Sequence, residues 1–425
     1  MADADVIVIG GGLAGLVAAF HAAERGRRVI LLDMEGPQSL GGQAWWSLGG
    51  LFMVDTPEQR RLRIRDSRDL AARDWHGSAG FDRPGDAMPR AWAEAYLDFA
   101  SGPMRGRLHA LGMRWFPVVG WAERGGSLAG GHGNSVPRFH VTWGTGTGVV
   151  KPYAERVTAH PRIELRFRHR VTDLLVEGGA VTGVSGEVLE PDDAVRGAST
   201  SRDVTGDFTL RAASVAVASG GIGGNHDLVR AAWPEARLGP APARMVSGVP
   251  DYVDGQMLGV AEAAGAEVIN RDRMWHYCEG LRNWDPIWPN HGIRILPGPS
   301  SVWFDAEGTR MEAPCFPGFD TLATLRRILS TGHAHSWFVL TQSIIEKEFA
   351  LSGSEQNPDL TGATWSGVIR ERLGRGATAA VEAFKTHGED FVVATDLGAL
   401  VDGMNRITPE APLDPARIRA QIEAR

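Results

Sequence analysis

Residues 6–33 read VIVIGGGLAGLVAAFHAAERGRRVILLD. The short run at 6–9 is rich in β-branched residues, which predicts a buried parallel strand. It leads into glycines spaced G-x-G-x-x-G, after which apolar residues at helical spacing predict a helix over 13–24. A second apolar run ends at Asp33. Strand, glycine turn, helix, strand and acid in this order are typical of a Rossmann dinucleotide-binding unit.

Each position of this motif has a physical role. Gly10 allows the tight turn, Gly12 lets the backbone approach a pyrophosphate, and Gly15 lets helix and strand pack closely. The helix N-terminus attracts phosphate charge, and Asp33 lies at the right distance to accept hydrogen bonds from ribose hydroxyls. We therefore assign to cofactor binding Gly10, Gly12, Leu13, Ala14, Gly15, Asp33 and Met34.

The next stretch, SLGGQAWWSLGG at 39–50, indicates which dinucleotide is bound. An NAD enzyme is expected to continue promptly with further βαβ units. Here two glycine pairs flank two tryptophans instead, which we interpret as a flat ligand lying against main chain. The sequence thus predicts the flavin end of FAD, with contacts from Gly41, Gly42, Gln43, Ser47, Gly49 and Gly50.

Composition limits the remaining alternatives. The chain has 425 residues with a formal net charge of −7, which argues against a general nucleic-acid surface. No uninterrupted apolar stretch reaches membrane-spanning length, and the N-terminus lacks a secretory signal pattern. Two cysteines provide no disulfide framework. We expect a cytoplasmic protein with no nucleic-acid partner and no membrane span.

Motifs spread along the chain extend the pattern. They are HRVTDLLVEGGAVTGV at 169–184, SVAVASGGIGGNHDLVR at 214–230, and an Asp-Gly pair at 254–255 before a helical run. The alternation around the glycines at 178–179 also predicts a β-hairpin on its own. With these motifs the sequence resembles the fumarate reductase and succinate dehydrogenase flavoprotein superfamily, and within it the FAD-binding dehydrogenases related to 3-ketosteroid 1-dehydrogenases.

The resemblance implies an α/β fold: a Rossmann-like FAD-binding domain of the glutathione-reductase type, with a parallel sheet, interrupted by an α+β cap domain for the substrate. We expect the FAD-binding domain over 1–250, the cap over 251–405, and the start of a return to the first domain over 406–425. In relatives the backbone of the residue matching Val171 contacts adenine. The resemblance adds to the cofactor site Val171, Ala218, Ser219, Gly220, Asn225 and Asp254.

Three departures from the family pattern carry further expectations. Succinate dehydrogenases attach FAD through a histidine in the glycine loop, but this loop has none, so FAD is expected to be noncovalent. None of the four tyrosines falls on the catalytic positions of ketosteroid 1-dehydrogenases. Nothing after Asp396 resembles the glycine-rich strand and helix with which relatives return to the flavin. We expect that final segment to be missing and the flavin site to be open on one side.

Two clusters contain residue types suited to hydride and proton transfer beside a carbonyl. Arg138 and His140 form one, and His276 and Tyr277 the other, in an aromatic-rich segment at 273–305 that is expected to line a cavity. Tyr277 is predicted as the acid or base, His140 or His276 as its proton partner, and Arg138 or Arg294 as the group holding a substrate oxygen. The alternative is that these side chains only pack at a domain interface.

The remaining patterns are weaker. The histidine pair at 333 and 335 lacks accompanying metal ligands, so no metal site is predicted. The polar segments 191–207 and 352–362 are interpreted as surface connections.

The sequence therefore predicts FAD-dependent dehydrogenation, or reduction, of a carbon–carbon bond beside a carbonyl, in a steroid-like or other apolar cyclic substrate. The electron acceptor stays open among a quinone, a carrier protein and a small molecule. One alternative is a truncated, non-catalytic nucleotide-binding remnant, which would bind flavin weakly or not at all. The other is an NAD-dependent dehydrogenase, which would bind nicotinamide and show no yellow colour.

Overall fold

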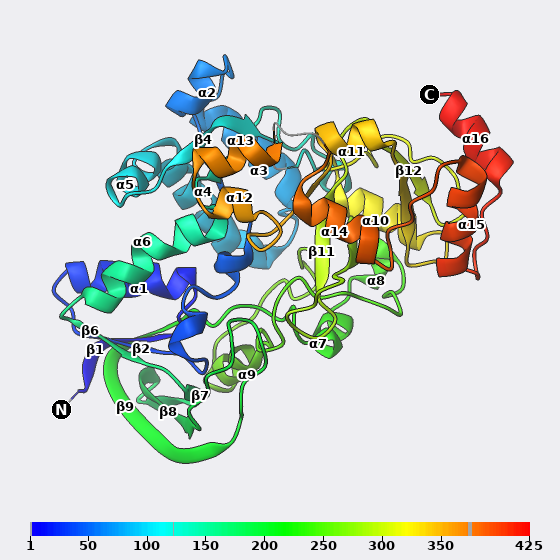
Figure 1. Ribbon diagram of the computed structural model, residues 1–425. Helices are drawn as coiled ribbons and strands as arrows, with labels where there is room; N and C mark the ends of the chain where they lie inside the picture. Colours follow the sequence, from blue (N-terminus) through cyan, green and yellow to red (C-terminus); the bar gives the residue numbers. More distant parts are fainter. Residues whose placement is uncertain (1, 122, 373–375) are drawn as a thin grey trace.

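The motif at 6–33 folds as its spacing predicts. The computed structural model describes residues 2–121, 123–372 and 376–425 (Figure 1). Strand β1 (Ala4–Ile9) leads through the glycine turn into α1 (Leu13–Glu24), and β2 (Val29–Leu32) ends one residue before Asp33. Side chains alternate across β1, because successive residues of a strand point to opposite faces. Val8 packs towards α1 and α6 (Thr145–Ala159), whereas Ile7 and Ile9 belong to a separate core on the other face.

Both strands belong to a six-stranded sheet in the order β6-β2-β1-β9-β8-β7. Four strands run parallel: β6 (Ile163–Arg166), β2, β1 and β9 (Val204–Val217). β7 (His169–Glu177) and β8 (Ala180–Leu189) are antiparallel additions. The first half of β9 pairs with β8 and its second half with β1. The predicted α/β fold with a mainly parallel sheet is confirmed.

The hairpin predicted around residues 178–179 is β7 and β8. Gly178 and Gly179 lie between them with φ of +59° and +80°. A two-residue turn that matches the twist of its strands requires positive φ at both positions, which glycine adopts without strain.

Residues 50–142 form a second layer beside the main sheet. A small antiparallel sheet has the order β3-β5-β4, with β3 (Gly50–Phe52), β5 (Phe139–Thr142) and β4 (Trp115–Gly120). The helices are α2 (Pro57–Arg61), α3 (Arg68–Ala79), α4 (Ala87–Ser101) and α5 (Met104–Ala110). Apolar residues of this layer share one core with α1 and α6.

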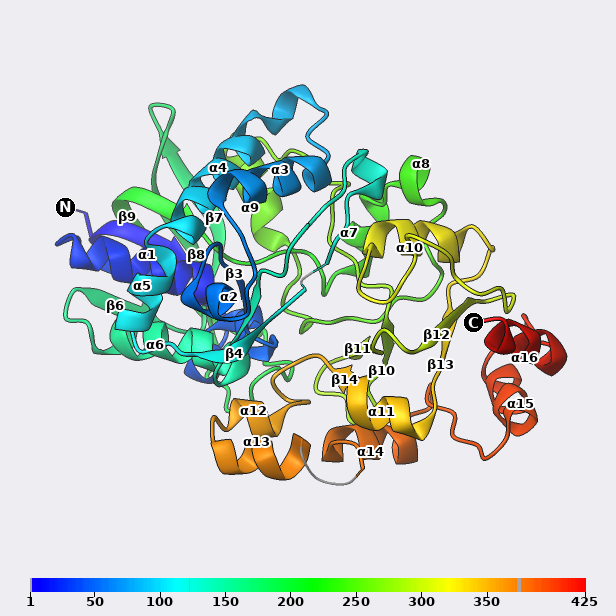
Figure 2. The ribbon, with the colours of Figure 1, turned by 90° about the horizontal axis from the view of Figure 1, so that it is seen from above.

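A second region follows residue 250 and lies beside the N-terminal sheet in both ribbon views (Figures 1 and 2). One of its sheets contains β10 (Gly280–Arg282), β11 (Gly292–Leu296) and β14 (Ala350–Leu351). Another pairs β12 (Val302–Asp305) with β13 (Ser336–Val339). Its helices include α10 (Thr321–Leu329), α11 (Gln342–Glu348) and α14 (Ala379–His387). Residues 273–305 consist of short strands and the loops between them.

Shorter helices connect the two regions. They are α7 (His226–Ala231), α8 (Glu235–Leu238), α9 (Gln256–Ala263), α12 (Pro358–Thr361) and α13 (Trp365–Arg372). The α12–α13 segment returns to the N-terminal region: Trp143 Nε1 donates to the carbonyl of Ala363 at 3.0 Å, and the hydroxyls of Thr145 and Thr361 are 2.8 Å apart. Part of the predicted 251–405 cap therefore packs on the first domain.

The C-terminal helices pack on the second region. α15 (Leu397–Ile407) and α16 (Pro415–Glu423) bury Val401 and Ile418 against Phe304 of β12. Gln421 Nε2 donates to the carbonyl of Gly308 at 2.6 Å. Residues 406–425 thus lie on the cap elements rather than on the six-stranded sheet, which corrects the expected return to the first domain.

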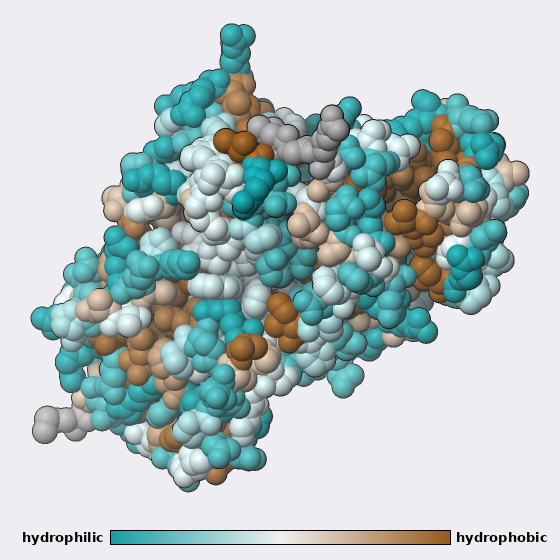
Figure 3. Space-filling model, in the orientation of Figure 1, coloured by the Kyte–Doolittle hydropathy of each residue, from teal (hydrophilic) through white to brown (hydrophobic). Residues whose placement is uncertain are grey.

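The surface view shows apolar side chains gathered on the face between α14 and α15 (Figure 3). Within residues 2–121, 123–372 and 376–425, no helix combines the length and apolar character needed to cross a membrane.

Candidate active site

The glycine turn leaves one open side next to the start of α1. A Cβ on Gly10 (φ +103°) would lie 2.6 Å from the carbonyl oxygen of Ala218, and one on Gly15 would lie 1.9 Å from that of Gly10. These two glycines are required by close packing of the chain. A Cβ on Gly12 would meet no atom of the described residues within 4 Å. α1 also begins without a side-chain cap or an acidic residue in its first turn, so this end of the helix fits a pyrophosphate.

Asp33 holds the glycine turn from the end of β2. Its Oδ2 accepts a hydrogen bond from the amide of Gly11 at 2.6 Å, and its Oδ1 accepts one from the amide of Glu35 at 2.8 Å. Burial is the main cause that raises the pKa of Asp33 to about 6. Each carboxylate oxygen keeps a further lone pair for a ribose hydroxyl. That contact stays a prediction.

The glycine loop at 39–50 is explained differently from the sequence-based interpretation. A Cβ on Gly41 would lie 2.3 Å from Val150 Cγ1, and one on Gly49 would lie 2.3 Å from the carbonyl carbon of Thr145. On Gly50 it would fall 1.8 Å from the ring of Phe139. These three positions lack side chains because the loop packs on α6 and β5. Packing within the chain thus accounts for these three glycines, and the predicted flavin contact of the loop stays a prediction.

The loop nevertheless borders a large cavity. Its short 3-10 helix (Gly42–Trp46) and the residues after it form one wall through Gln43, Trp46, Ser47, Leu48, Gly49 and Gly50. The cavity has a volume of about 2510 Å³ and continues along the cap. Pockets for one small ligand usually measure about 300–1,000 Å³. This cavity has room for the ring end of a dinucleotide together with a second molecule.

Two segments predicted as surface connections hold the glycine loop. From 352–362, the amide of Ser354 donates to the carbonyl of Trp46 at 2.9 Å. From 191–207, the Arg196 guanidinium lies 3.8 Å from the Trp45 ring centroid and donates to the carbonyl of Leu40 at 3.0 Å. Both interpretations as simple surface connections are therefore corrected.

The other residues assigned to the cofactor have defined structural contacts. Gly220 (φ +91°) lies against the Gln43 side chain, because a Cβ at this position would be 3.0 Å from Gln43 Nε2. Asn225 caps α7 and donates to the carbonyl of Asp254 at 3.2 Å. Val171 is buried in β7. Their contacts with FAD stay predictions.

Tyr277 and Arg294 face the cavity together from the cap. The Arg294 guanidinium carbon lies 4.0 Å from the centroid of the Tyr277 ring. Arg294 pairs with Glu279 at the long distance of 3.5 Å, and its buried Nε has no partner among the described residues. A buried donor without a partner is costly, so this site is suited to a ligand oxygen.

His276 lines the same wall. Its ring lies 4.8 Å from that of Trp233, and burial lowers its pKa. Its buried Nε2 has no hydrogen-bond partner in the described part of the chain. The structure therefore brings together the second predicted cluster, His276 and Tyr277, with Arg294.

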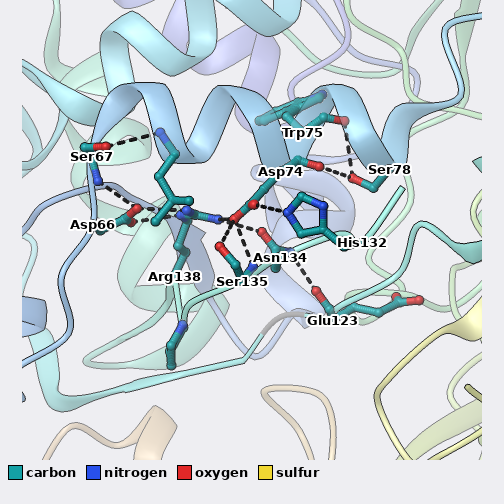
Figure 4. A network of polar contacts seen from close by, with 12 residues as sticks. Asp66, Ser67, Asp74, Trp75, Ser78, Glu123, His132, Asn134, Ser135 and Arg138 are labelled. Atoms are coloured by element: carbon teal, nitrogen blue, oxygen red, sulfur yellow. Dashed lines mark hydrogen bonds and ion pairs between the residues drawn. The ribbon is translucent and has the colours of Figure 1, made fainter. Parts of the chain in front are cut away.

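The first predicted cluster lies elsewhere. Arg138 is fully buried and makes four hydrogen bonds: two to Asp66 at 2.8 Å each, one to Asp74 at 2.6 Å and one to Asn134 at 3.0 Å (Figure 4). His140 is also buried, with Nε2 2.8 Å from the hydroxyl of Thr56. Neither side chain lines the cavity, so the packing alternative describes Arg138 and His140, and their predicted catalytic roles are not retained.

One cavity residue missed by the sequence reasoning is His291. Its Nδ1 accepts hydrogen bonds from Asn283 Nδ2 and the amide of Ile287, both at 3.1 Å, which places the ring proton on Nε2. The ring stacks on Trp288 with 3.6 Å between centroids, and burial lowers the pKa of His291 to about 4. The ring is thus a neutral donor held in a fixed orientation. Its only sequence signal was its place in the aromatic segment.

The glycine turn beside an uncapped helix end, and the cavity that starts at the glycine loop, fit a flavin-dependent oxidoreductase of α/β type. A family model described as "FAD binding domain" matches residues 5–425, and the chain belongs to this family. FAD is its cofactor, and the predicted FAD-dependent dehydrogenase is confirmed in preference to an NAD enzyme.

Individual relatives are similar over nearly all of the chain. A "KsdD-like steroid dehydrogenase" of Mycolicibacterium smegmatis is 59% identical over 428 residues, covering 100% of this chain and 77% of the relative. A protein of the same description from Mycobacterium tuberculosis is 57% identical over 422 residues, covering 99% of this chain and 74% of the relative.

Solved structures agree on the fold. A 3-ketosteroid-delta4-(5alpha)-dehydrogenase from Rhodococcus jostii has a TM-score of 0.55 at 17% identity, covering 90% of this chain and 77% of the other. A 3-ketosteroid delta1-dehydrogenase from Sterolibacterium denitrificans has a TM-score of 0.58 at 15% identity, covering 82% and 70%. At these identities the likeness concerns architecture alone.

Proposed function

We propose that this protein dehydrogenates a steroid-like ring ketone at a carbon–carbon bond next to the carbonyl. The observation that carries the proposal is the cavity of about 2510 Å³ running from the glycine loop to the cap. Similarity to proteins described as steroid dehydrogenases, at 59% and 57% identity, supports the substrate class.

The cavity walls favour a fused-ring substrate. Many of their side chains are flat and apolar, and a rigid apolar ligand buries its surface against such rings without losing much conformational freedom. The aromatic residues lining the cavity are Trp46, Trp121, Phe139, Trp233, Trp275, Tyr277, Trp288, Phe319, Trp337, Phe338, Phe349 and Phe391.

The proposed cofactor site begins at the open side of Gly12 and the start of α1, which hold the pyrophosphate, with Asp33 for the ribose. It continues along the glycine loop, where Gln43 and Ser47 line the cavity and would hold the flavin ring. Bound FAD supplies the oxidant by accepting a hydride from the substrate. The absence of a histidine in the loop fits noncovalent attachment.

Arg294 and Tyr277 hold the substrate carbonyl oxygen. Arg294 and Tyr277 line one wall of the cavity, and a guanidinium and a phenol can both donate hydrogen bonds. Donors fixed at this position stabilise negative charge as it develops on the oxygen, which makes the neighbouring C–H bonds more acidic. Tyr277 acts as the acid in this arrangement. His276 packs beside Trp233 and helps to shape the same wall of the cavity.

The test is turnover of 3-ketosteroids by the FAD-loaded protein with an external electron acceptor, comparing a quinone with a soluble dye. We expect loss of two hydrogens from the substrate by mass spectrometry, together with bleaching of the flavin absorbance when the acceptor is omitted. A matched sterol without the ketone serves as the control and should leave the flavin oxidised. Unchanged flavin absorbance with every ring ketone tested contradicts the proposal.

A further inference from the structure

The loop that follows β14 places a carboxyl group, that of Glu355, at the junction of cap and glycine loop. The amide of Ser352 donates to the carbonyl of Arg294 at 2.9 Å, and that of Ser354 donates to the carbonyl of Trp46 at 2.9 Å. Asn357 Nδ2 closes the loop with bonds to the carbonyls of Leu351 and Gly353, at 2.8 and 2.7 Å. Glu355 is therefore fixed between the strand that presents Arg294 and the loop assigned to the flavin.

The Glu355 carboxyl lines the cavity without a partner for one of its oxygens. Oε2 is buried and makes no hydrogen bond to the described residues. The carboxyl lies over Gly353 (φ +111°), where a Cβ would come within 2.3 Å of Oε1. Any side chain at position 353 would displace the Glu355 carboxyl, so a glycine here allows the carboxyl to occupy its observed position.

The charged groups around the loop are engaged with one another. Arg372 pairs with Asp359 at 2.7 Å and donates to Asn357 Oδ1 at 2.8 Å, while Arg294 is directed to Glu279 and Tyr277. With no cation of the described residues paired to it, the buried carboxyl favours its neutral form. Burial raises the pKa of Glu355 to about 7.

Dehydrogenation beside a carbonyl requires a base for one of the two hydrogens. An efficient base has a pKa close to the working pH, whereas a phenol in water ionises near pH 10. Arg294 and Tyr277 are donors, and His291 offers its protonated nitrogen. The base must therefore be another group, one that exists in both its protonated and its deprotonated form near neutral pH.

We propose that Glu355 is the catalytic base of this dehydrogenase. This inference rests on the proposed function. The ionised carboxylate takes the proton from the carbon next to the carbonyl, and the electron pair of that C–H bond becomes the new carbon–carbon double bond. The hydrogen on the adjacent carbon leaves with its electron pair to the oxidised flavin, so two electrons and two hydrogens are balanced. The proton on Glu355 then leaves to solvent.

The first test compares Glu355→Gln and Glu355→Asp with Glu346→Gln, an exposed glutamate on α11. Each is purified with FAD, and kcat and KM for a ring ketone are measured between pH 5 and 9. We expect Glu355→Gln to lower kcat by about 10²-fold or more, with FAD affinity and KM within about twofold. Glu355→Asp should regain part of the rate, and Glu346→Gln should match the wild type. A Glu355→Gln rate within about threefold of wild type overturns the proposal.

The second readout is independent of turnover. Infrared difference spectra of wild type minus Glu355→Gln, with and without FAD, report the carbonyl band of a protonated carboxyl. We expect a band that disappears with a midpoint near pH 7 and persists in Glu346→Gln. A Glu355 carboxyl that is ionised throughout pH 5–9 overturns the proposal, whatever the substrate. If ring ketones do not react but the band titrates near pH 7, the substrate class fails, while the protonation behaviour that a base at position 355 requires is supported.

Discussion

Arg138 and Arg294 show two uses of the same side chain. Arg138, next to the start of β5, is fully buried and makes four hydrogen bonds to Asp66, Asp74 and Asn134. Arg294, on β11, has 18% of its side chain exposed, one ion pair at 3.5 Å and a buried nitrogen without a partner among the described residues.

The difference teaches how to separate structural from functional polar groups. Buried polar atoms in folded proteins are nearly always hydrogen-bonded, so an incomplete set at a cavity wall indicates a position for a ligand. A buried side chain whose hydrogen bonds are all made within the protein has a structural role. Arg138 therefore holds β5 to α3 (Figure 4), and Arg294 is the residue we propose to hold a substrate oxygen.

Removing the complete network should have the largest effect. Arg138→Met leaves two buried carboxylates without their cation, which typically costs about 3–5 kcal/mol of folding stability. We expect a clear fall in the thermal unfolding midpoint measured by circular dichroism. Arg60→Met, which breaks an exposed pair with Asp55, is the control and should change stability by less than about 1 kcal/mol. Equal effects of the two substitutions would contradict the comparison.

Replacing Arg294, whose hydrogen bonds are incomplete, should affect the rate of turnover rather than the stability of the fold. Arg294→Gln is expected to lower kcat for a ring ketone by about 10²–10³-fold, the usual effect of losing one fixed donor to a developing oxyanion. The unfolding midpoint should stay close to that of the wild type. Steady-state kinetics and thermal unfolding of the same preparation check both parts. A variant that unfolds as early as Arg138→Met would show that Arg294 is structural.

Glu355→Gln should stabilise the fold at high pH. This result would further separate functional polar groups from structural ones. Burial raises the pKa of Glu355 from 4.5 to about 7. Below pH 4.5 the carboxyl is protonated in both the folded and the unfolded chain, so it does not lower the folding stability. Between pH 4.5 and 7 the unfolded chain loses the proton first, so wild-type stability falls as pH rises.

The neutral glutamine avoids this loss. We expect Glu355→Gln to gain about 1–3 kcal/mol over wild type at pH 8 and little at pH 4, from denaturant unfolding at each pH. Loss of stability at both pH values would indicate a purely structural glutamate.

The smallest expected effect is at the glycine turn. Gly12→Ala introduces a methyl group where no atom of the described residues lies within 4 Å, so stability should change by less than about 0.5 kcal/mol. The same methyl group enters the proposed pyrophosphate site, and FAD affinity should fall by about tenfold or more, or about 1.4 kcal/mol. Fluorescence titration with FAD measures the affinity. Unchanged FAD affinity would place the pyrophosphate elsewhere.

The sequence predicted the parts of the fold that depend on local pattern. The β1–α1–β2 unit follows from periodicity and glycine positions within about 30 residues, and the hairpin at 178–179 from alternation and turn residues. His276 and Tyr277 can be predicted because aromatic and polar residues concentrate in one segment. For these elements neighbouring residues carry the determining information.

Contacts between distant segments could not be read in the same way. The residue type of Arg138 suggests a catalytic role, but its actual role is set by Asp66 and Asp74, whose positions depend on how α3 packs. Glu355 sits in a polar stretch that looks like an exposed connection, and only the pairing of β14 with β11 brings it to the cavity. The glycines at 41, 49 and 50 likewise reflect α6 and β5, which lie about 100 residues further along.

The hydrogen bond from the amide of Ser354 to the carbonyl of Trp46 has a consequence for folding during protein synthesis. The glycine loop leaves the ribosome long before its partners, because residue 354 follows residue 46 by about 300 residues, or roughly 15–60 s at usual rates of elongation. During that interval Trp45 lacks the Arg196 guanidinium, and Trp46 lacks Ser354 and the ring of Trp288, which packs edge-on against it in the folded protein. The β1–α1–β2 unit can form early from local contacts, but the flavin end of the site is completed only late in translation. Cofactor capture is therefore expected after most of the chain has emerged.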